Sequence, residues 1–406
     1  MVLTPADPRA GDQRSEAVLR RLVLVVGAVV FLDTMFYAVI TPLLPQLTHE
    51  LRLSKASAGL MTAGYAIGML VASLPGGILA ARFGPRRTVV LGLLLLACST
   101  VAFGLVHSAV ALDLARILEG VGGACSWAGG IAWIVAAAPV ERRGEMIGRA
   151  VGAAVGGALF GPAIGALASA TGRPVVFCAL GGVALALIVV TRTLPDLAET
   201  SNQGVRMVLA AIPRRPMPAA LWLMLLPAAA SGIINVLGPL RMHSFGAGAA
   251  VIGATWLVAL GLEALVAPVV GRVSDRRGRL VPLRAGLVAV AVTLACFTLP
   301  GAVAPLAVVI ICTALALGTF WAPAMALLSD VVEAAGLDHA LGAALMNLAW
   351  AGGQIVGSAG GGAIAKAGGD LLPTAGAAAV CALTAVALFR RSAARDPALS
   401  PASRSA

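Results

Sequence analysis

The chain of 406 residues is a succession of apolar runs, each about as long as a helix that crosses a bilayer. A membrane-spanning helix takes about 20 apolar residues, and twelve such segments can be marked along the chain. They are residues 22–47, 58–81, 88–106, 111–138, 146–171, 174–192, 219–242, 249–273, 281–300, 303–332, 340–366 and 372–389. We therefore predict an all-α membrane protein with twelve transmembrane helices in two pseudo-symmetric six-helix bundles.

Composition excludes the other classes of chain. The residues AVILMFWYC make up 59%, charged residues make up 12%, and the mean hydropathy is +0.96. These values exclude a disordered chain, a soluble enzyme and a disulfide scaffold. Long unbroken apolar runs, in place of short alternating segments, exclude a transmembrane β-barrel. The six cysteines are scattered singly, so we predict no disulfide framework, no metal site and no cofactor.

The basic charges predict the orientation of the spans. With the N-terminus inside, 23 of the 29 Lys and Arg residues fall in inner segments and five fall in outer ones. Cytoplasmic loops carry an excess of Lys and Arg, so both termini should be cytoplasmic in a bacterial inner (plasma) membrane. The net charge of +11 then reports topology, and no nucleic-acid partner is needed to explain it. The first apolar run has no convincing cleavage site and is interpreted as an uncleaved span.

The longest polar interruption divides the chain into two halves. Residues 193–218 are predicted to form a cytoplasmic linker, because they combine Pro, Asp, Glu, Asn and basic residues. The two bundles are then residues 17–192 and 219–390. The N-terminal tail (1–16) and the C-terminal tail (391–406) are predicted to be mobile.

The two halves carry matching motifs. Residues 77–87 follow the second span and resemble residues 271–279 after the eighth span, at an offset of 194. The fifth span contains Gly157-x-x-x-Gly161-Pro162, and the eleventh contains Gly353-x-x-x-Gly357 at an offset of 196. Two matches at nearly one offset indicate a parallel duplication, which places a substrate site between the halves near the membrane midplane.

These motifs resemble the major facilitator superfamily, and in particular its twelve-span drug/proton antiporters, over nearly the whole chain. The loop after the second span is similar to the family signature Gly-x-x-x-Asp-Arg-x-Gly-Arg-Arg, through Gly77, Arg82, Gly84, Arg86 and Arg87. Its second copy contains Gly271, Asp275, Arg276, Gly278 and Arg279. The resemblance implies that this loop holds one conformation by charge contacts at helix ends. In the first copy Ala81 stands where the family has Asp, so that carboxylate is missing from these contacts.

Three further motifs extend the resemblance. Arg116-x-x-x-Gly120 in the fourth span is similar to a motif of proton-coupled members. Gly157, Gly161 and Pro162 resemble the fifth-span signature of antiporters. Leu32-Asp33-Thr34 with Pro42-Leu-Leu-Pro45 resembles drug exporters and vesicular amine transporters. The alternative for the glycines is ordinary tight helix packing, since small residues let helices approach closely in lipid.

Four ionisable residues lie more than one helical turn inside a span, where they are costly and mark function by default. We predict Asp33, Glu119 and Glu263 as proton-coupling residues, with Arg116 as a charge partner. A carboxylate taken out of water can take and give a proton near neutral pH. Three alternatives stay open. Arg116 neutralises Asp33, or Arg116 and Glu119 form a salt bridge that makes the span tolerable, or Glu263 is a snorkelling or packing group.

Polar and aromatic residues inside the spans predict the substrate cavity. They offer stacking surfaces and cation–π attraction for a flat lipophilic molecule, and the alternative is helix packing. The predicted cavity residues are Tyr37, Trp127, Asn235, Trp256, Trp321, Asn347 and Gln354.

The sequence thus predicts a monomeric, proton-coupled secondary active transporter in the lipid bilayer. It would export small lipophilic, cationic molecules, as in drug or metabolite efflux, by alternating access. One alternative is a proton symporter or facilitator for a sugar, amino acid or organic acid, and another is a membrane sensor or scaffold. An enzyme is disfavoured, because the sequence contains no H-x-x-x-x-D motif and no phosphate loop.

Overall fold

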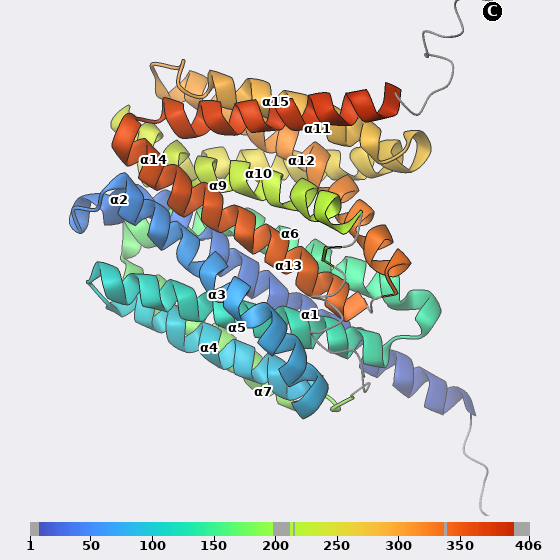
Figure 1. Cartoon of the computed structure of the whole chain (residues 1–406). Coiled ribbons are helices and arrows are strands. Elements are labelled where there is room, and N and C mark those ends of the chain that lie inside the picture. The colour runs from blue at the N-terminus through green and yellow to red at the C-terminus, as the bar shows by residue number, and fades with distance from the viewer. Residues whose placement is uncertain (1–7, 198–211, 214–215, 337–338, 394–406) are drawn as a thin grey trace, which may run out of the picture.

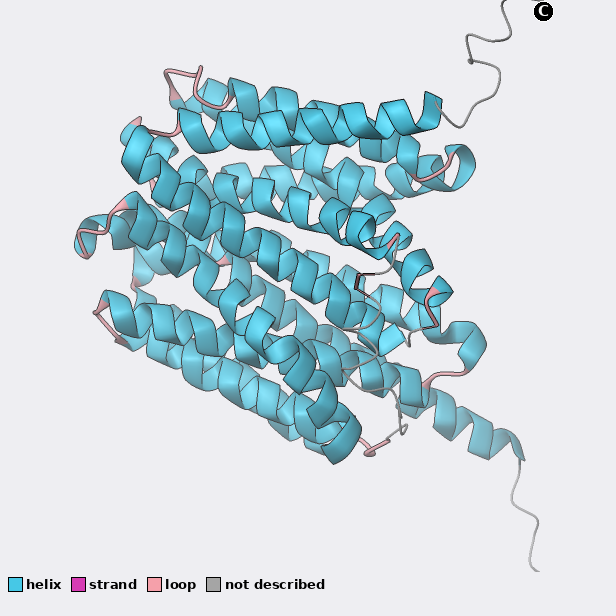
Figure 2. Ribbon diagram, viewed as in Figure 1, coloured by secondary structure: helices cyan, strands magenta, loops and turns pink. Residues whose placement is uncertain are grey.

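The computed structural model describes residues 8–197, 212–213, 216–336 and 339–393, and within these ranges the chain forms helices and no strand (Figures 1 and 2). The prediction of an all-α chain is confirmed for this part. The helices are α1 (Pro8–Ala38), α2 (Ile40–Glu50), α3 (Lys55–Phe83), α4 (Pro85–Leu105), α5 (Ala109–Ala137), η1 (Val140–Arg142), α6 (Arg143–Thr171), α7 (Arg173–Arg192), α9 (Met217–Ser244), α10 (Ala249–Arg277), α11 (Leu280–Cys296), α12 (Val303–Ala334), α13 (His339–Ile355), η2 (Val356–Gly360), α14 (Gly361–Gly368) and α15 (Leu371–Ala393).

These helices supply the twelve predicted crossings. Ten are long and apolar enough to cross a membrane, with α1 and α2 counted as one. The helix α11 is apolar but has only 17 residues. The remaining crossing is α13 and α14, joined through the π-helical segment η2.

Local sequence explains where several helices break. Gly84 has φ +89° between α3 and α4, and Gly278 has φ +85° after α10, a backbone conformation that glycine adopts without steric cost. The two glycines hold equivalent places in the two halves. Pro42 has no N–H to donate to the carbonyl of Ala38, so the first crossing bends at Val39, between α1 and α2.

The helices form two bundles, α1–α7 and α9–α15, whose strongest contacts are internal. In Figure 1, α4, α5 and α7 lie on one side of the molecule, α11, α12 and α15 lie on the other, and α1, α6 and α13 lie between them. The bundles meet where α3 packs on α13 and α14, and where α6 packs on α10.

The matching glycines occupy equivalent helix crossings in the two halves. Gly157 on α6 lies against the backbone carbonyl of Phe31 on α1, and Gly353 on α13 lies against that of Leu225 on α9. At both places a Cβ atom would overlap the facing backbone. Each crossing therefore needs glycine, as close helix approach in a bilayer requires.

Helices extend a short way into both predicted tails. The helix α1 begins at Pro8, within the segment 1–16, and α15 ends at Ala393, within the segment 391–406. The mobility of the two tails stays a prediction. Hydropathy marks where apolar residues stop, whereas helical hydrogen bonds continue into polar residues. The parts of both tails beyond these helices lie outside the described residues.

The predicted linker 193–218 falls where the two bundles are joined. The helix α7 ends at Arg192 and α9 begins at Met217. Most of the linker (198–211 and 214–215) lies outside the described residues.

Candidate functional site

A cavity of about 1690 Å³ lies between the two bundles. Its walls come from α1, α2, α3, α5 and α6 of the first half and α9, α10, α12 and α13 of the second. It reaches from Thr41 in α2 to Arg82 and Arg143, close to the turn at Gly84. We call the end of the molecule that carries this turn the basic end. The cavity therefore extends from the middle of the bundle to the basic end.

All seven predicted cavity residues line this one cavity. They are Tyr37, Trp127, Asn235, Trp256, Trp321, Asn347 and Gln354. Two of them are fixed by hydrogen bonds within the second half. The indole N–H of Trp256 donates to Oδ1 of Asn235 at 3.0 Å, and Nε2 of Gln354 donates to Oγ of Ser231 at 2.7 Å. Their role in substrate binding stays a prediction.

An aromatic cluster joins the halves across the cavity. The ring of Tyr37 lies 5.0 Å from that of Tyr65 and 5.3 Å from that of Trp350, centroid to centroid. Trp350 belongs to α13, so the cluster spans the boundary between the bundles. Sequence reasoning missed Tyr65. Its signal was rarity, because Tyr37 and Tyr65 are the chain's two tyrosines and both fall within predicted spans.

The carboxyl group of Asp33 is fully buried behind this cavity wall. Its Oδ2 accepts hydrogen bonds from the hydroxyl of Tyr65 and from the indole N–H of Trp127, both at 2.9 Å. Its Oδ1 has no hydrogen-bond partner among the described residues. Tyr65 and Trp127 line the cavity whereas Asp33 does not. Asp33 therefore lies one side chain away from the cavity.

Gly123 makes room for this carboxyl group. A Cβ atom there would lie 2.5 Å from Oδ1 of Asp33 and 2.6 Å from the hydroxyl oxygen of Tyr65. Glycine on α5 thus lets the carboxyl of α1 and the phenol of α3 meet at one point.

The structure brings Arg116 to Glu119 and not to Asp33. Nη1 of Arg116 lies 2.8 Å from Oε2 of Glu119, and both side chains are buried. The same guanidinium donates to the carbonyls of Phe36 at 3.0 Å and Tyr37 at 3.2 Å. These carbonyls lie at the end of α1, where helical acceptors lose their partners. The arrangement matches the alternative in which the pair makes the span tolerable.

Glu263 is placed differently from Asp33. It lies on α10, lines the cavity, and is only partly buried. Its side chain packs over Gly318 of α12, where a Cβ atom would meet its Cγ. No ion pair to it is present among the described residues. The two carboxylates are therefore not equivalent, since one is sealed and the other opens on the cavity.

The loop motifs of the two halves form ion pairs with different acidic residues. In the first copy, Nε of Arg86 lies 3.7 Å from Asp196 and its Nη1 donates to the carbonyl of Leu194 at 3.0 Å. Asp196, just after α7, therefore supplies a carboxylate where Ala81 has none. In the second copy, Nη1 of Arg279 lies 2.8 Å from Oδ2 of Asp330 on α12.

The other predicted motif residues occupy two kinds of place. Gly161 packs on α1 in the same way as Gly157, and Gly353 packs on α9. Pro162 lies inside α6, and its carbonyl meets Gly253 of α10. The residues Gly77 and Gly271 have open space around their Cα atoms, and Arg82, Arg87, Asp275 and Arg276 are exposed near the basic end.

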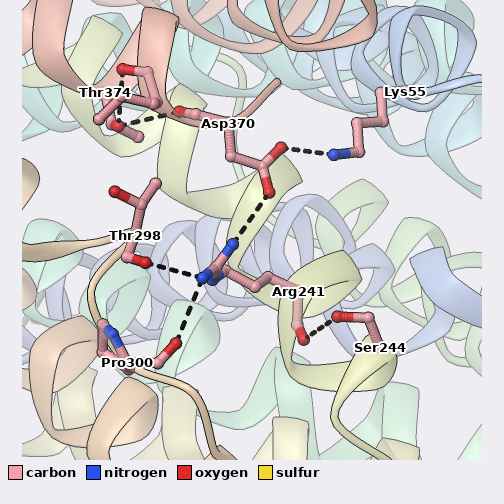
Figure 3. A network of polar contacts seen from close by, with 8 residues as sticks. Lys55, Arg241, Ser244, Thr298, Pro300, Asp370 and Thr374 are labelled. Carbon is pink, nitrogen blue, oxygen red and sulfur yellow. Dashed lines mark hydrogen bonds and ion pairs between the residues drawn. The ribbon is translucent and has the colours of Figure 1, made fainter.

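A second charged cluster closes the opposite end of the molecule (Figure 3). Nζ of Lys55 on α3 lies 2.5 Å from Oδ1 of Asp370, in the turn before α15. Oδ2 of Asp370 lies 3.6 Å from Nη1 of Arg241 on α9, whose Nη2 donates to the carbonyls of Thr298 and Pro300. Lys55 is thus the member contributed by the first half. Lys55 and Arg241 are two of the five basic residues that the charge count places in outer segments.

Among the described residues, no group of three or more His, Cys, Asp or Glu side chains could hold a metal ion. The cavity lining offers one carboxyl group, two guanidinium groups, amides, hydroxyls and aromatic rings.

Parts of the chain are similar to bacterial drug-resistance proteins. Multidrug resistance protein 1 of Bacillus subtilis (strain 168) is 29% identical over 167 residues, which cover 41% of this chain and 43% of that protein. The quinolone resistance protein NorA of Staphylococcus aureus (strain MRSA252) is 25% identical over 176 residues, covering 43% and 45%. Each alignment spans less than half the length of the curated relative.

Whole-chain comparisons extend this likeness. The partially occluded, inward-open xylose transporter XylE from E. coli superposes with a TM-score of 0.71 at 14% identity, covering 92% of this chain and 99% of that one. At this identity the likeness shows the fold alone. The model of the Major Facilitator Superfamily matches residues 26–230 and 220–405, which together are nearly the whole chain. The chain therefore belongs to the major facilitator superfamily of membrane transporters.

Proposed function

We propose that this transporter exports small lipophilic cations in exchange for protons. The observation that supports this best is Asp33, a fully buried carboxyl group inside a membrane-spanning helix and one side chain away from the cavity. A carboxyl group inside a membrane span is energetically costly, and its presence there therefore suggests a function. Its two neutral hydrogen-bond donors can accommodate it in either ionisation state.

Asp33 and Glu263 then have separate roles. Asp33 carries the exchanged proton, because it is sealed from the cavity. Glu263 attracts the positive charge of the substrate, because it opens on the cavity and no ion pair among the described residues occupies it. The indoles of Trp256 and Trp321 offer faces on which a flat cation can stack. Glu119 is matched by Arg116 and is assigned a structural role.

Alternating access follows from the placement of the cavity. We place the basic end in the cytoplasm, following the bias of Lys and Arg, so the described conformation faces inward. The bundles 17–192 and 219–390 rock against each other. Asp33 takes a proton when the cavity faces outward, and the substrate leaves there. The deprotonated site then accepts the next substrate from inside.

The relatives support the substrate class. Those from B. subtilis and S. aureus are named for drug and quinolone resistance. The xylose transporter shares only the fold, so its sugar substrate gives no argument for sugar transport here.

A reconstituted system tests the proposal directly. The purified chain is placed in liposomes with the membrane potential clamped, and tetraphenylphosphonium uptake is measured under an imposed pH gradient. An antiporter accumulates the cation in vesicles with an acidic interior, whereas a symporter accumulates it in vesicles with an alkaline interior. Asp33→Asn should abolish gradient-driven uptake. The matched control is Glu333→Gln, which neutralises an exposed carboxylate on α12 and should transport as the parent chain does. Undiminished uptake by Asp33→Asn would remove the proposed role of Asp33.

A further inference from the structure

The route between the cavity and Asp33 passes two side chains. Tyr65 and Trp127 both line the cavity, and both donate to the same oxygen, Oδ2. The carboxyl itself has no exposed surface. A proton can therefore reach Asp33 from the cavity through the phenol hydroxyl, or after one of these rings moves.

The two donors differ in what they can do with a proton. A phenol hydroxyl both donates and accepts, so Tyr65 can pass a proton along. An indole N–H only donates, so Trp127 can hold the carboxyl or release it but cannot relay. Tyr65 is fixed between the ring of Tyr37 and the guanidinium of Arg116, which lies 5.6 Å from its ring. Trp127 is only partly buried, and its ring borders the open cavity.

We propose that Trp127 is the residue through which a bound substrate and the proton on Asp33 exclude each other. This inference rests on the proposed function. A hydrogen bond from an N–H to an ionised carboxylate is about twice as strong as one to a neutral acid. An ionised Asp33 therefore holds the indole against the cavity wall. A flat cation stacked on the indole favours the same position, since the ring then has no room to swing inward.

Protonation of Asp33 has the opposite effect on Trp127. Oδ1 has no partner among the described residues and lies in the space left by Gly123, so the proton can be added there while Oδ2 keeps its donors. The bond from Trp127 to the neutral acid is weaker, and the indole is then free to turn into the space where the cation binds. Substrate and proton compete through this ring without touching each other.

The neighbouring charges leave this role to Trp127. The charged groups that act on the carboxyl are Glu119 and Arg116 on α5, and these are paired with each other at 2.8 Å. The remaining titratable neighbour is Tyr65 on α3. Trp127 presents more of its side chain to the cavity than any of these three. Arg116 and Glu119 do not line the cavity, and Tyr65 lines it but is nearly fully buried.

The test compares two tryptophans, one at the cavity and one away from it. Trp127→Phe keeps an aromatic face and removes the N–H that bonds Asp33. Trp222→Phe is the matched control, because its N–H also bonds a side chain, the hydroxyl of Thr384, but Trp222 lies on α9 and does not line the cavity. The full chain in detergent and weak buffer is titrated with tetraphenylphosphonium, and the cation bound and the protons released are both measured.

The expected result is a loss of coupling in one variant only. The parent chain and Trp222→Phe should release the same number of protons per bound cation, and both should bind more tightly at alkaline than at acid pH. In Trp127→Phe the ratio of alkaline to acid affinity should fall by up to about tenfold, the amount by which a hydrogen bond to a charged group exceeds one to a neutral group. Equal proton release and equal pH dependence in all three proteins would overturn the inference.

The Asp33→Asn background separates this inference from the proposed function. There the proton release should vanish, and adding Trp127→Phe should change nothing further. Release that persists in Asp33→Asn contradicts the proposed function itself. Release that vanishes in Asp33→Asn but stays intact in Trp127→Phe contradicts only the role of Trp127.

If Trp127→Phe does not fold, hydrogen exchange of the Trp127 indole N–H in the parent chain decides. Tetraphenylphosphonium should slow this exchange, and an unchanged rate would overturn the inference.

Discussion

The carboxyl group of Asp33 fits between its neighbours because a glycine stands at position 123. Its carboxyl group occupies space that exists because position 123 carries no Cβ atom. Two donors reach one of its oxygens and leave the other for a proton. The geometry around this carboxyl group, the proposed proton site, is therefore set jointly by α1, α3 and α5.

At this scale, Gly123→Ala should uncouple transport. The added Cβ would lie 2.5 Å from Oδ1 of Asp33, so the carboxyl must turn away from its donors. Losing a hydrogen bond to a charged group costs about 1.5–3 kcal/mol, so we expect at least about a tenfold fall in gradient-driven uptake. The matched control is Gly182→Ala on α7, where a Cβ meets nothing within 4 Å. Equal uptake by the two variants would contradict this view of the site.

Single helices are matched to their neighbours through glycine faces. The face of α6 that carries Gly157, Gly161 and Gly165 lies on α1 and the start of α2, and the equivalent face of α13 and η2 lies on α9. In a bilayer such faces replace the hydrophobic drive that brings helices together in water. The π-helical turn η2 falls within this face, where Gly357 meets the backbone of α9.

A pair of variants on α6 tests this packing. Gly157→Ala inserts a Cβ into the backbone of Phe31, and overpacking of this kind costs about 1–3 kcal/mol. Gly152→Ala lies on the same helix with nothing within 4 Å, and alanine favours a helix over glycine by up to about 1 kcal/mol. Thermal unfolding in detergent should show a lower Tm for Gly157→Ala and an unchanged or higher Tm for Gly152→Ala. A higher Tm for Gly157→Ala than for Gly152→Ala would contradict the close crossing of α6 and α1 at Gly157.

The whole molecule is closed at one end and open at the other. At the closed end, α3 crosses α14 closely at Gly59 and Gly362, and Lys55 reaches Asp370 across the boundary between the bundles. Arg241 lies in the same half as Asp370, so it stays with that carboxylate when the bundles separate. Of the ion pairs described in this cluster, opening this end therefore breaks the one made by Lys55 and leaves the one made by Arg241.

Lys55→Met should shift the molecule towards its outward-facing conformation. The side chain of Lys55 is 40% exposed, and an exposed ion pair contributes about 0.2–1 kcal/mol, which allows up to about a fivefold shift. The measurement is the alkylation rate of Thr41→Cys, at a cavity position of α2, by an impermeant maleimide outside cells whose transporter lacks its native cysteines. Faster alkylation is expected for Lys55→Met. The control, Arg52→Met, changes an exposed basic residue of the same turn and should leave the rate unchanged. Equal alkylation rates in the two variants would show that the ion pair of Lys55 with Asp370 does not hold this end closed.

Much of this architecture could be predicted because hydropathy is local in sequence. The twelve crossings and the break between Arg192 and Met217 follow from runs of adjacent residues. The cavity residues were also predictable, since a polar or indole side chain inside a span is costly on the lipid side. Tyr65 was missed because its neighbours in sequence are apolar, and its hydrogen bond to Asp33 depends on how α3 is placed relative to α1.

Residue order alone therefore determined the class of this protein, its number of crossings, its internal duplication and the charges that lie in the membrane. The tertiary structure decided which of those charges meet. Arg116 pairs with Glu119 and not with Asp33, Arg86 pairs with Asp196, and Lys55 pairs with a residue 315 positions away. Apolar length is a property of one segment, whereas a contact depends on how two helices are rotated and how closely they cross.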